Sequence, residues 1–202
     1  MQDIIKKYIE SPEILNIYLH GSRVYKTNTD SSDYDFIIVI KDEYYFSENV
    51  SEGNCDFNFY SKTKWIEMCN NNSLDFCECY FLPEEYKIKE TFVPDFIIQK
   101  EKIRANFSHV SSNSFVKAKK KLVVEKDFAP YIGKKSLWHS FRILMFGIQI
   151  LSSEKIVDYS CANFLYDEIV KNPENEWNYY KEKYQALYNH YRSEFRKFDI
   201  EK

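Results

Sequence analysis

The fold is decided by His20-Gly21-Ser22-Arg23-Val24-Tyr25, followed after a short polar segment by Ser32-Asp33-Tyr34-Asp35-Phe36. Residues 14–19, just before the glycine, form a strand candidate. Gly21 and Ser22 interrupt that strand and start a loop or a helical turn. Residues 34–40 are an almost continuous apolar run, which is typical of a buried central strand. The pattern predicts two strands separated by a glycine turn and a polar loop.

Three carboxylates are associated with this predicted sheet. Asp33 and Asp35 are two positions apart at the start of the second strand, so their side chains point to the same face. Asp56 lies on the polar face of an alternating strand, residues 55–60, and could reach the same place. Neighbouring carboxylates repel each other unless a cation lies between them, and hard oxygen ligands suit Mg²⁺ or Mn²⁺. The three aspartates therefore predict a divalent-metal site of the kind that assists phosphoryl displacement.

The segment after the first strand has the composition of a phosphate-binding turn. Gly21 lets the backbone approach a phosphate closely, and a helical turn after it directs N–H groups at the anion. The Ser22 hydroxyl can add a hydrogen bond, and Arg23 or Lys26 can add positive charge. Each feature alone is common, and it is their conjunction with the three carboxylates that indicates a nucleotide site.

Together these motifs resemble the signature of the DNA polymerase β superfamily of nucleotidyltransferases. The similarity is greatest to the small bacterial and viral branch, written Gly-Ser-Arg-x-Tyr-Gly-Thr … Ser-Asp-x-Asp, and it covers about residues 17–60. The resemblance implies that Gly21 and Ser22 bind the triphosphate of an NTP and that Asp33 and Asp35 hold both metals. Asp56 would be the third ligand, placed to help remove the proton from the attacking hydroxyl.

The same resemblance implies the architecture. We expect an α+β fold, in which a polymerase β-like nucleotidyltransferase head, a small mixed sheet with flanking helices, is followed by a helical domain. After Pro94 the apolar spacing changes from the strand period to the helix period. This change predicts a catalytic domain over residues 1–93 and a helical domain over residues 94–202, with the active site between them.

Other elements are expected from local patterns. Residues 41–54 are predicted to be a loop, and residues 74–94 to be irregular with a short strand near 79–82. The helices expected in the second half are 95–107, 114–125, 135–151, 160–171 and 175–198.

Lys26 departs from the family pattern, which usually has a second glycine at this position. A side chain there could crowd the loop, or its ammonium could help to hold phosphate. All three carboxylates and the Gly-Ser pair remain, so we expect an active enzyme. The alternative is a non-catalytic module that binds nucleotide or RNA.

Basic residues form two groups in the second half. Lys135, His139 and Arg142 share a narrow arc of an otherwise apolar helix. Burying unpaired cations is costly, so this stripe either pairs with carboxylates elsewhere or lines the nucleotide cleft. A similar Lys-Lys-x-x-x-His-x-x-Arg helix occurs in the resembled branch, and Lys134 completes the match. The second group is either a solvated face or a contact with phosphates of an RNA acceptor; its members are Lys117, Lys119, Lys120, Lys121 and Lys126.

Composition limits the partners. The net charge of −3 argues against general attraction to polyanions, so any nucleic-acid site has to be local. No secretory signal and no apolar run near the roughly 20 residues of a membrane span is seen. The five cysteines are irregularly spaced, which favours structural thiols in a reducing cytoplasm.

The sequence leaves the acceptor of the nucleotide open. The alternatives are an RNA end, a protein hydroxyl, as in toxin–antitoxin systems, and a small molecule such as an aminoglycoside. ATP is the commonest donor in the resembled branch.

Overall fold

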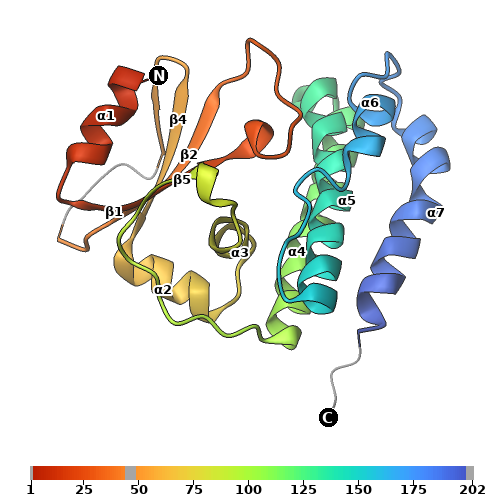
Figure 1. Cartoon of the computed structure of the whole chain (residues 1–202). Helices are drawn as coiled ribbons and strands as arrows, with labels where there is room; N and C mark the ends of the chain where they lie inside the picture. Colours follow the sequence, from red (N-terminus) through yellow and green to blue (C-terminus); the bar gives the residue numbers. More distant parts are fainter. Residues whose placement is uncertain (1, 44–48, 199–202) are drawn as a thin grey trace. The chain divides into compact units, whose positions relative to one another are not determined.

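The computed structural model describes residues 2–43 and 49–198, and it divides into two compact units. Unit 1 comprises Met1–Ile97 and unit 2 comprises Ile98–Lys202. A mixed sheet with flanking helices in unit 1 and a helical unit 2 confirm the expected fold class (Figure 1).

Unit 1 is built on a five-stranded sheet of order β3-β4-β2-β1-β5. The central strand β2 runs parallel to β4 and antiparallel to β1, and β3 and β5 are antiparallel edge strands. In chain order the elements are α1 (Gln2–Glu10), β1 (Ile14–His20), β2 (Tyr34–Ile40), β3 (Asn49–Glu52), β4 (Cys55–Ser61), α2 (Lys62–Asn70), α3 (Leu74–Tyr80) and β5 (Lys87–Glu90), with 3₁₀ turns at Gly21–Arg23 and Glu84–Tyr86.

The two faces of this sheet have different chemistry. On one face Phe36 of β2 stacks on Phe57 of β4, with ring centroids 5.3 Å apart, and Tyr8 of α1 covers Phe57 at 4.6 Å. Successive strand residues alternate between faces, so Asp35 and Asp56 belong to the opposite face. Helices α2 and α3 pack on that second face (Figure 1), where Trp65 of α2 lies against the rings of Tyr18 in β1 and Tyr60 in β4.

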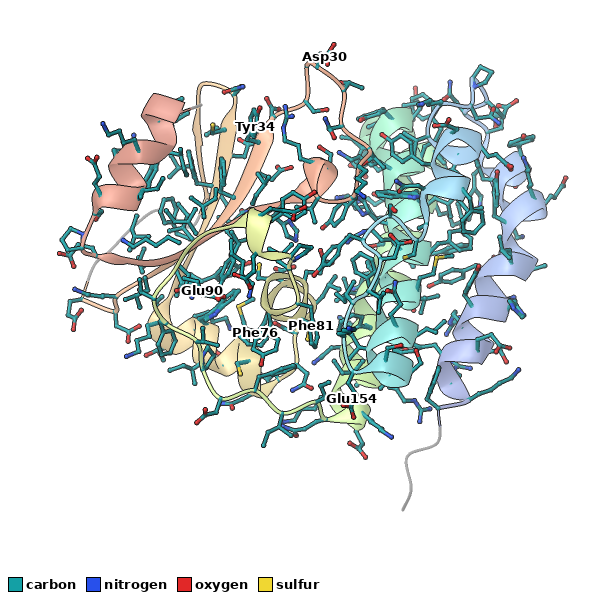
Figure 2. The ribbon with its side chains drawn as sticks, in the orientation of Figure 1. Asp30, Tyr34, Phe76, Phe81, Glu90 and Glu154 are labelled. Carbon is teal, nitrogen blue, oxygen red and sulfur yellow. The ribbon has the colours of Figure 1, made fainter. Side chains whose placement is uncertain are left out.

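Three local predictions in unit 1 are wrong. Residues 74–80 form helix α3 rather than irregular chain, and the expected strand at 79–82 does not exist; the strand of this region is β5. Helix α3 is buried around most of its circumference, so it shows no amphipathic period. Phe76, within the helix, and Phe81, just after its end (both labelled in Figure 2), pack on Phe96. The expected loop 41–54 contains the edge strand β3, whereas residues 44–48 lie outside the described part of the chain.

Unit 2 is organised by two long helices. In chain order its elements are α4 (Lys100–Val123), α5 (Pro130–Ser153), α6 (Tyr166–Ile169) and α7 (Trp177–Arg196), with 3₁₀ turns at Glu125–Asp127 and Asn163–Leu165. Helices α4 and α5 pack closely because Gly133 faces Leu122: a Cβ at Gly133 would lie 2.8 Å from the Leu122 side chain. No helix in the described part of the chain is both long and apolar enough to cross a membrane.

The helix boundaries in unit 2 differ from those expected. The two helices predicted over 95–107 and 114–125 are a single helix, α4, and the segment 160–171 holds only a short 3₁₀ turn and α6. The polar residues between Ser108 and Ser114 interrupt the apolar helical spacing, so the sequence indicates a break between two helices there. Tertiary contacts satisfy them instead: Ser111 Oγ donates to Ser140 O at 2.7 Å and pairs with Tyr188 Oη at 2.9 Å.

Gly147 tests the packing of α5 against its neighbours. A Cβ at this position would lie 2.6 Å from the buried ring of Phe195 in α7 and 3.3 Å from Phe107 in α4. Gly147→Ala should therefore lower the free energy of unfolding by about 1–3 kcal/mol through overpacking. This sign is opposite to the stabilisation of about 0.5–1 kcal/mol expected from helix propensity alone. Urea unfolding followed by circular dichroism measures the change, and a stabilised variant would contradict the close packing.

Candidate active site

The end of β1 and the start of β2 meet at Gly21 and Asp35. His20 is the register partner of Asp35 in this antiparallel pair. Gly21 has a φ of +74°, and a Cβ built on it would lie 2.0 Å from Oδ2 of Asp35. Glycine is therefore required here for two separate reasons, its left-handed backbone and the position of the carboxylate against its Cα.

The chain then closes into a compact turn. The amides of Val24 and Tyr25 both donate to Gly21 O at 3.1 Å, and the amide of Thr27 donates to Ser22 O at 2.9 Å. Lys26, just before Thr27, has a φ of +59°. A six-residue hydrogen bond closed over a left-handed residue is the Schellman arrangement, in which glycine is favoured for its backbone freedom.

This geometry explains the departure from the family pattern at Lys26. The side chain of Lys26 is exposed, so it does not crowd the turn. A non-glycine residue in the left-handed region costs roughly 1–2 kcal/mol, a local strain that the surrounding hydrogen bonds can maintain. Lys26 thus adds strain to the turn, while the bond from Thr27 N to Ser22 O still closes it.

Arg23 connects the turn to the first metal-ligand candidate. Its Nη2 donates to Ser32 O at 2.6 Å, and its guanidinium carbon lies 3.6 Å from the centroid of the Tyr34 ring. Tyr34 begins β2, and Asp30 lies in the loop that leads to it (Figure 2). Arg23 therefore holds the polar loop on both sides of Asp33. The sequence predicted only that Arg23 adds positive charge to the turn.

Two of the three aspartates share one face of the sheet. Asp35 and Asp56 are register partners on the parallel strands β2 and β4, and adjacent strands lie about 4.8 Å apart. Asp33 precedes β2 and is exposed. The carboxylate of Asp56 accepts a hydrogen bond from Ser51 Oγ.

As placed, these side chains do not converge into a metal site: within residues 2–43 and 49–198, no three His, Cys, Asp or Glu side chains form a metal-binding group. The donor set nevertheless fits Mg²⁺ or Mn²⁺, because it consists of hard carboxylate oxygens on adjacent strands. Asp56 would have to turn from Ser51 to complete it.

A buried polar group next to the turn was not predicted. Glu78 of α3 is 1% exposed, and its Oε2 lies 2.9 Å from His20 Nε2 and accepts a hydrogen bond from Tyr25 Oη. His20 Nε2 and Tyr25 Oη are themselves 3.1 Å apart. The only signal in the sequence is that Glu78 is one of two charged residues, with Asp75, in the mostly apolar segment 74–82, which does not reveal its partners.

The stripe of basic residues in unit 2 is partly paired within that unit. Arg142 is buried, and its Nε donates to His139 Nδ1 at 3.1 Å while its guanidinium carbon lies 4.8 Å from the Phe146 ring. Lys134 is also buried and donates to the carbonyl of Asn172 at 2.6 Å. Lys135 is half-buried. Lys134 therefore has a structural contact, while the arc of Lys135, His139 and Arg142 exists as predicted on α5.

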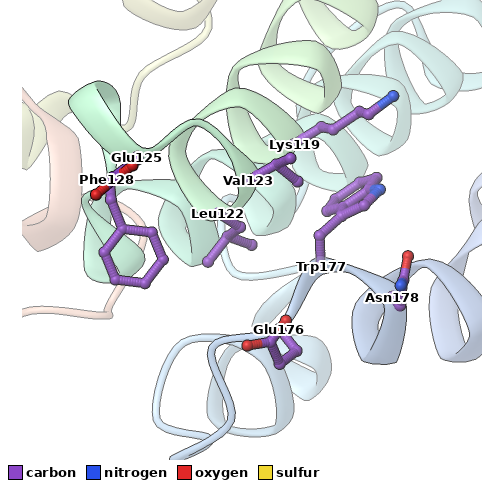
Figure 3. A pocket seen from close by; sticks show the side chains of 8 residues that line it. All are labelled: Lys119, Leu122, Val123, Glu125, Phe128, Glu176, Trp177 and Asn178. Carbon is purple, nitrogen blue, oxygen red and sulfur yellow. The ribbon is translucent and has the colours of Figure 1, made fainter.

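The lysine-rich face of α4 is exposed at Lys117, Lys119 and Lys120, and Lys120 pairs with Asp127 at 3.1 Å. Lys119 lines an open pocket of about 570 Å³ between the end of α4 and the start of α7 (Figure 3). The pocket also contains the aromatic side chains of Phe128 and Trp177, and its remaining lining residues are Leu122, Val123, Glu125, Glu176 and Asn178.

The cysteines have the properties of structural thiols. All five are free, and four of them are buried, with Cys161 partly exposed. Burial raises the pKa of the Cys77 and Cys79 thiols well above the ordinary value, and it raises the pKa of Cys161 to about 12. Raised pKa values keep these groups protonated, which opposes both nucleophilic and metal-binding roles.

Comparison with known proteins agrees with the geometry of unit 1. The family model described as Polymerase beta, Nucleotidyltransferase matches residues 2–80, a range that contains Gly21, Ser22 and all three aspartates. Unit 1 carries a polymerase β nucleotidyltransferase domain. The match confirms the resemblance seen in the sequence and identifies residues 2–80 as a nucleotidyltransferase domain.

One solved structure shows a similar fold over nearly the whole chain. A spectinomycin adenyltransferase from Enterococcus faecialis, solved with ATP and spectinomycin, aligns at a TM-score of 0.53 and 12% identity over 97% of this chain and 96% of its own. A nucleotidyltransferase-like protein from Exiguobacterium sibiricum gives a TM-score of 0.37 at 10% identity, over 98% and 76% of the two chains. No curated protein matches the chain.

Replacing Lys26 tests the strain assigned to the nucleotidyltransferase turn. Lys26→Gly should raise the free energy of unfolding by about 0.5–1 kcal/mol, because relief of the left-handed strain exceeds the entropic cost of glycine. Lys26→Ala retains a Cβ and should leave stability close to wild type. Chemical denaturation of the three proteins measures the effect, and equal gains for Ala and Gly would contradict it.

A second prediction concerns the metal. Mn²⁺ at about ten times its Kd should stabilise the wild type by roughly 1.4 kcal/mol through preferential binding to the folded state. The isosteric variants Asp33→Asn and Asp35→Asn should lose this gain, yet without metal they should be at least as stable, because carboxylate repulsion is removed. Thermal unfolding with and without Mn²⁺ measures both the stabilisation by the metal and the stability of the metal-free variants. Retained Mn²⁺ stabilisation in both variants would show that these aspartates do not bind it.

Proposed function

We propose that this nucleotidyltransferase transfers a nucleoside monophosphate from an NTP, with ATP as the first candidate, to a hydroxyl acceptor and releases pyrophosphate. The observation that carries the proposal is the approach of Gly21 to Asp35 beside Asp56, which combines a close-fitting backbone turn with neighbouring carboxylates. A phosphate and the cations that accompany it need these two features side by side. The protein of similar fold that was solved with ATP supports the choice of donor.

Residues of unit 1 would have separate roles in the proposed reaction. Asp33, Asp35 and Asp56 would hold Mg²⁺ or Mn²⁺, which when bound supplies positive charge against the phosphates and lowers the pKa of the attacking hydroxyl. Gly21 and Ser22 would bind the triphosphate through backbone and hydroxyl groups. Our proposal gives Asp56 a second task, because its carboxylate can accept the proton of the acceptor hydroxyl.

Cationic side chains would complete the nucleotide site. The exposed ammonium of Lys26 extends from the turn itself and can meet a phosphate oxygen. Arg23 contributes mainly by bracing the loop, since Ser32 and Tyr34 already hold its guanidinium. In unit 2 we propose Lys135, His139 and Arg142 as further nucleotide-binding groups, on the basis of their charge and their sequence pattern.

An RNA end is our first candidate for the acceptor. Lys117 and Lys119 are exposed on α4, and the exposed ring of Phe128 lies in the same pocket as Lys119 (Figure 3). Lysines together with accessible aromatic rings are the combination that binds single-stranded nucleic acid. A protein hydroxyl and a small molecule are the other acceptors to compare. The five free cysteines and the NTP donor agree with a cytoplasmic location.

The decisive experiment follows the labelled phosphate. The wild type is incubated with each α-labelled NTP and Mg²⁺ or Mn²⁺, in turn with total RNA, lysate protein and aminoglycosides including spectinomycin. We expect transfer to one acceptor class, RNA in our proposal. The double variant Asp33→Asn/Asp35→Asn should lose at least about a thousand-fold in rate, because oriented charge stabilisation is the main catalytic contribution.

The outcomes separate the alternatives. Label on a protein identifies a protein-nucleotidylating enzyme, and label on a small molecule identifies an antibiotic-modifying type of activity. Equal transfer by the folded double variant would refute the aspartate mechanism. Nucleotide binding without any transfer would leave the non-catalytic module as the correct interpretation.

A further inference from the structure

We infer that Glu78 is a positioning residue for the nucleotide-binding turn, an inference that rests on the proposed function. Two side chains converge on one of its oxygens: His20 Nε2 lies 2.9 Å from Oε2, and Tyr25 Oη donates to the same atom. One residue precedes the turn and the other lies within it, because His20 directly precedes Gly21 and Tyr25 lies four positions after it. A single carboxylate oxygen thus holds the chain before the turn and inside it.

The burial of Glu78 requires an explanation of this kind. Its side chain is 1% exposed, and an ionised carboxylate is costly to remove from water unless hydrogen bonds replace the lost solvent. The neighbours of Glu78 on α3, Cys77 and Cys79, are completely buried and apolar, so an apolar side chain would have satisfied packing alone. The carboxylate is therefore retained for the two donors that it binds.

Helix α3 is a fixed support for this contact. Its N-terminal residue Leu74 and its central Phe76 are buried, and Asp75 accepts a hydrogen bond from Tyr60 of β4 at 3.0 Å. That bond ties the helix to the sheet independently of the turn. Glu78 transmits the position of this rigid helix to His20 and Tyr25.

The turn has little tolerance for displacement. Gly21 approaches Asp35 so closely that even a methyl group would overlap the carboxylate. The amide of Tyr25 also donates to Gly21 O, so a shift of Tyr25 is passed to the glycine. Loosening the bonds to Glu78 should therefore widen the range of turn conformations and reduce the fraction that fits a triphosphate. No contact of Glu78 with substrate is required.

The test measures nucleotide affinity, so it does not depend on the identity of the acceptor. The probe is ATP with a methylene bridge between the α- and β-phosphates, with Mg²⁺, titrated by calorimetry into the full chain. Tyr25→Phe, which removes one donor to Glu78, should raise Kd about five- to ten-fold, because the loosened turn less often has the conformation that fits a triphosphate. Glu78→Gln keeps an acceptor oxygen and should weaken binding less than Glu78→Ala.

Tyr60→Phe is the matched control. It removes a tyrosine-to-carboxylate bond from the same helix, at Asp75, without touching the turn. Its Kd should stay within about two-fold of wild type, although its melting temperature should fall about as much as that of Tyr25→Phe. Wild-type affinity in folded Tyr25→Phe and Glu78→Gln, or equal weakening by Tyr60→Phe, would overturn the positioning role.

A second readout keeps the inference separate from the proposed function. Amide hydrogen exchange at Val24, Tyr25 and Thr27 reports the bonds inside the turn. It should accelerate in Tyr25→Phe and Glu78→Gln and stay unchanged in Tyr60→Phe. If the wild type failed to bind the ATP analogue, the proposed function would fall, whereas unchanged exchange in the two variants would refute the inference itself.

Discussion

The carboxylate of Asp35 lies against the Cα of Gly21, and the geometry around the site depends on this approach. Antiparallel pairing of β1 with β2 sets it, because His20 and Asp35 are register partners. Only glycine leaves room for the carboxylate and also accepts the left-handed backbone that starts the turn. The turn proposed to bind phosphate and the carboxylate of Asp35 are thereby brought together by backbone hydrogen bonds before any ligand contributes.

Two separate supports preserve this arrangement. Arg23 holds the polar loop through Ser32 and the ring of Tyr34, and so fixes the approach to Asp33. Glu78 also holds His20, just before the turn, and Tyr25, within it. The first support is a guanidinium that contacts a carbonyl oxygen and an aromatic ring. The second is a buried carboxylate that accepts hydrogen bonds. Neither support needs to touch a substrate, so the residues that organise the site are not themselves part of its proposed chemistry.

Lys26 shows how a motif departure is judged once the backbone is known. In the sequence it is a departure from the family glycine, with a side chain that either crowds the loop or helps to hold phosphate. In the structure it is the left-handed residue of a Schellman turn whose closing bond, Thr27 N to Ser22 O, is formed. Lys26 therefore costs local strain but is compatible with the closed turn, and activity has to be judged from the aspartates instead.

The sequence alone determined the parts that depend on local repetition and on a dense motif. The apolar run of β2, the alternation of β4, the spacing of Asp33 and Asp35, and the glycine turn all follow from periods and residue types within a few positions. These were enough to predict the fold class and to select Gly21, Ser22 and the three aspartates.

Tertiary structure alone decided the features that depend on residues far away in the sequence. Helix α3 has no amphipathic period because it is buried on most sides, and α4 continues through Ser111 because Ser140 and Tyr188 satisfy its hydroxyl. The role of Glu78 likewise arises from residues more than fifty positions away, whose hydrogen bonds no local pattern records.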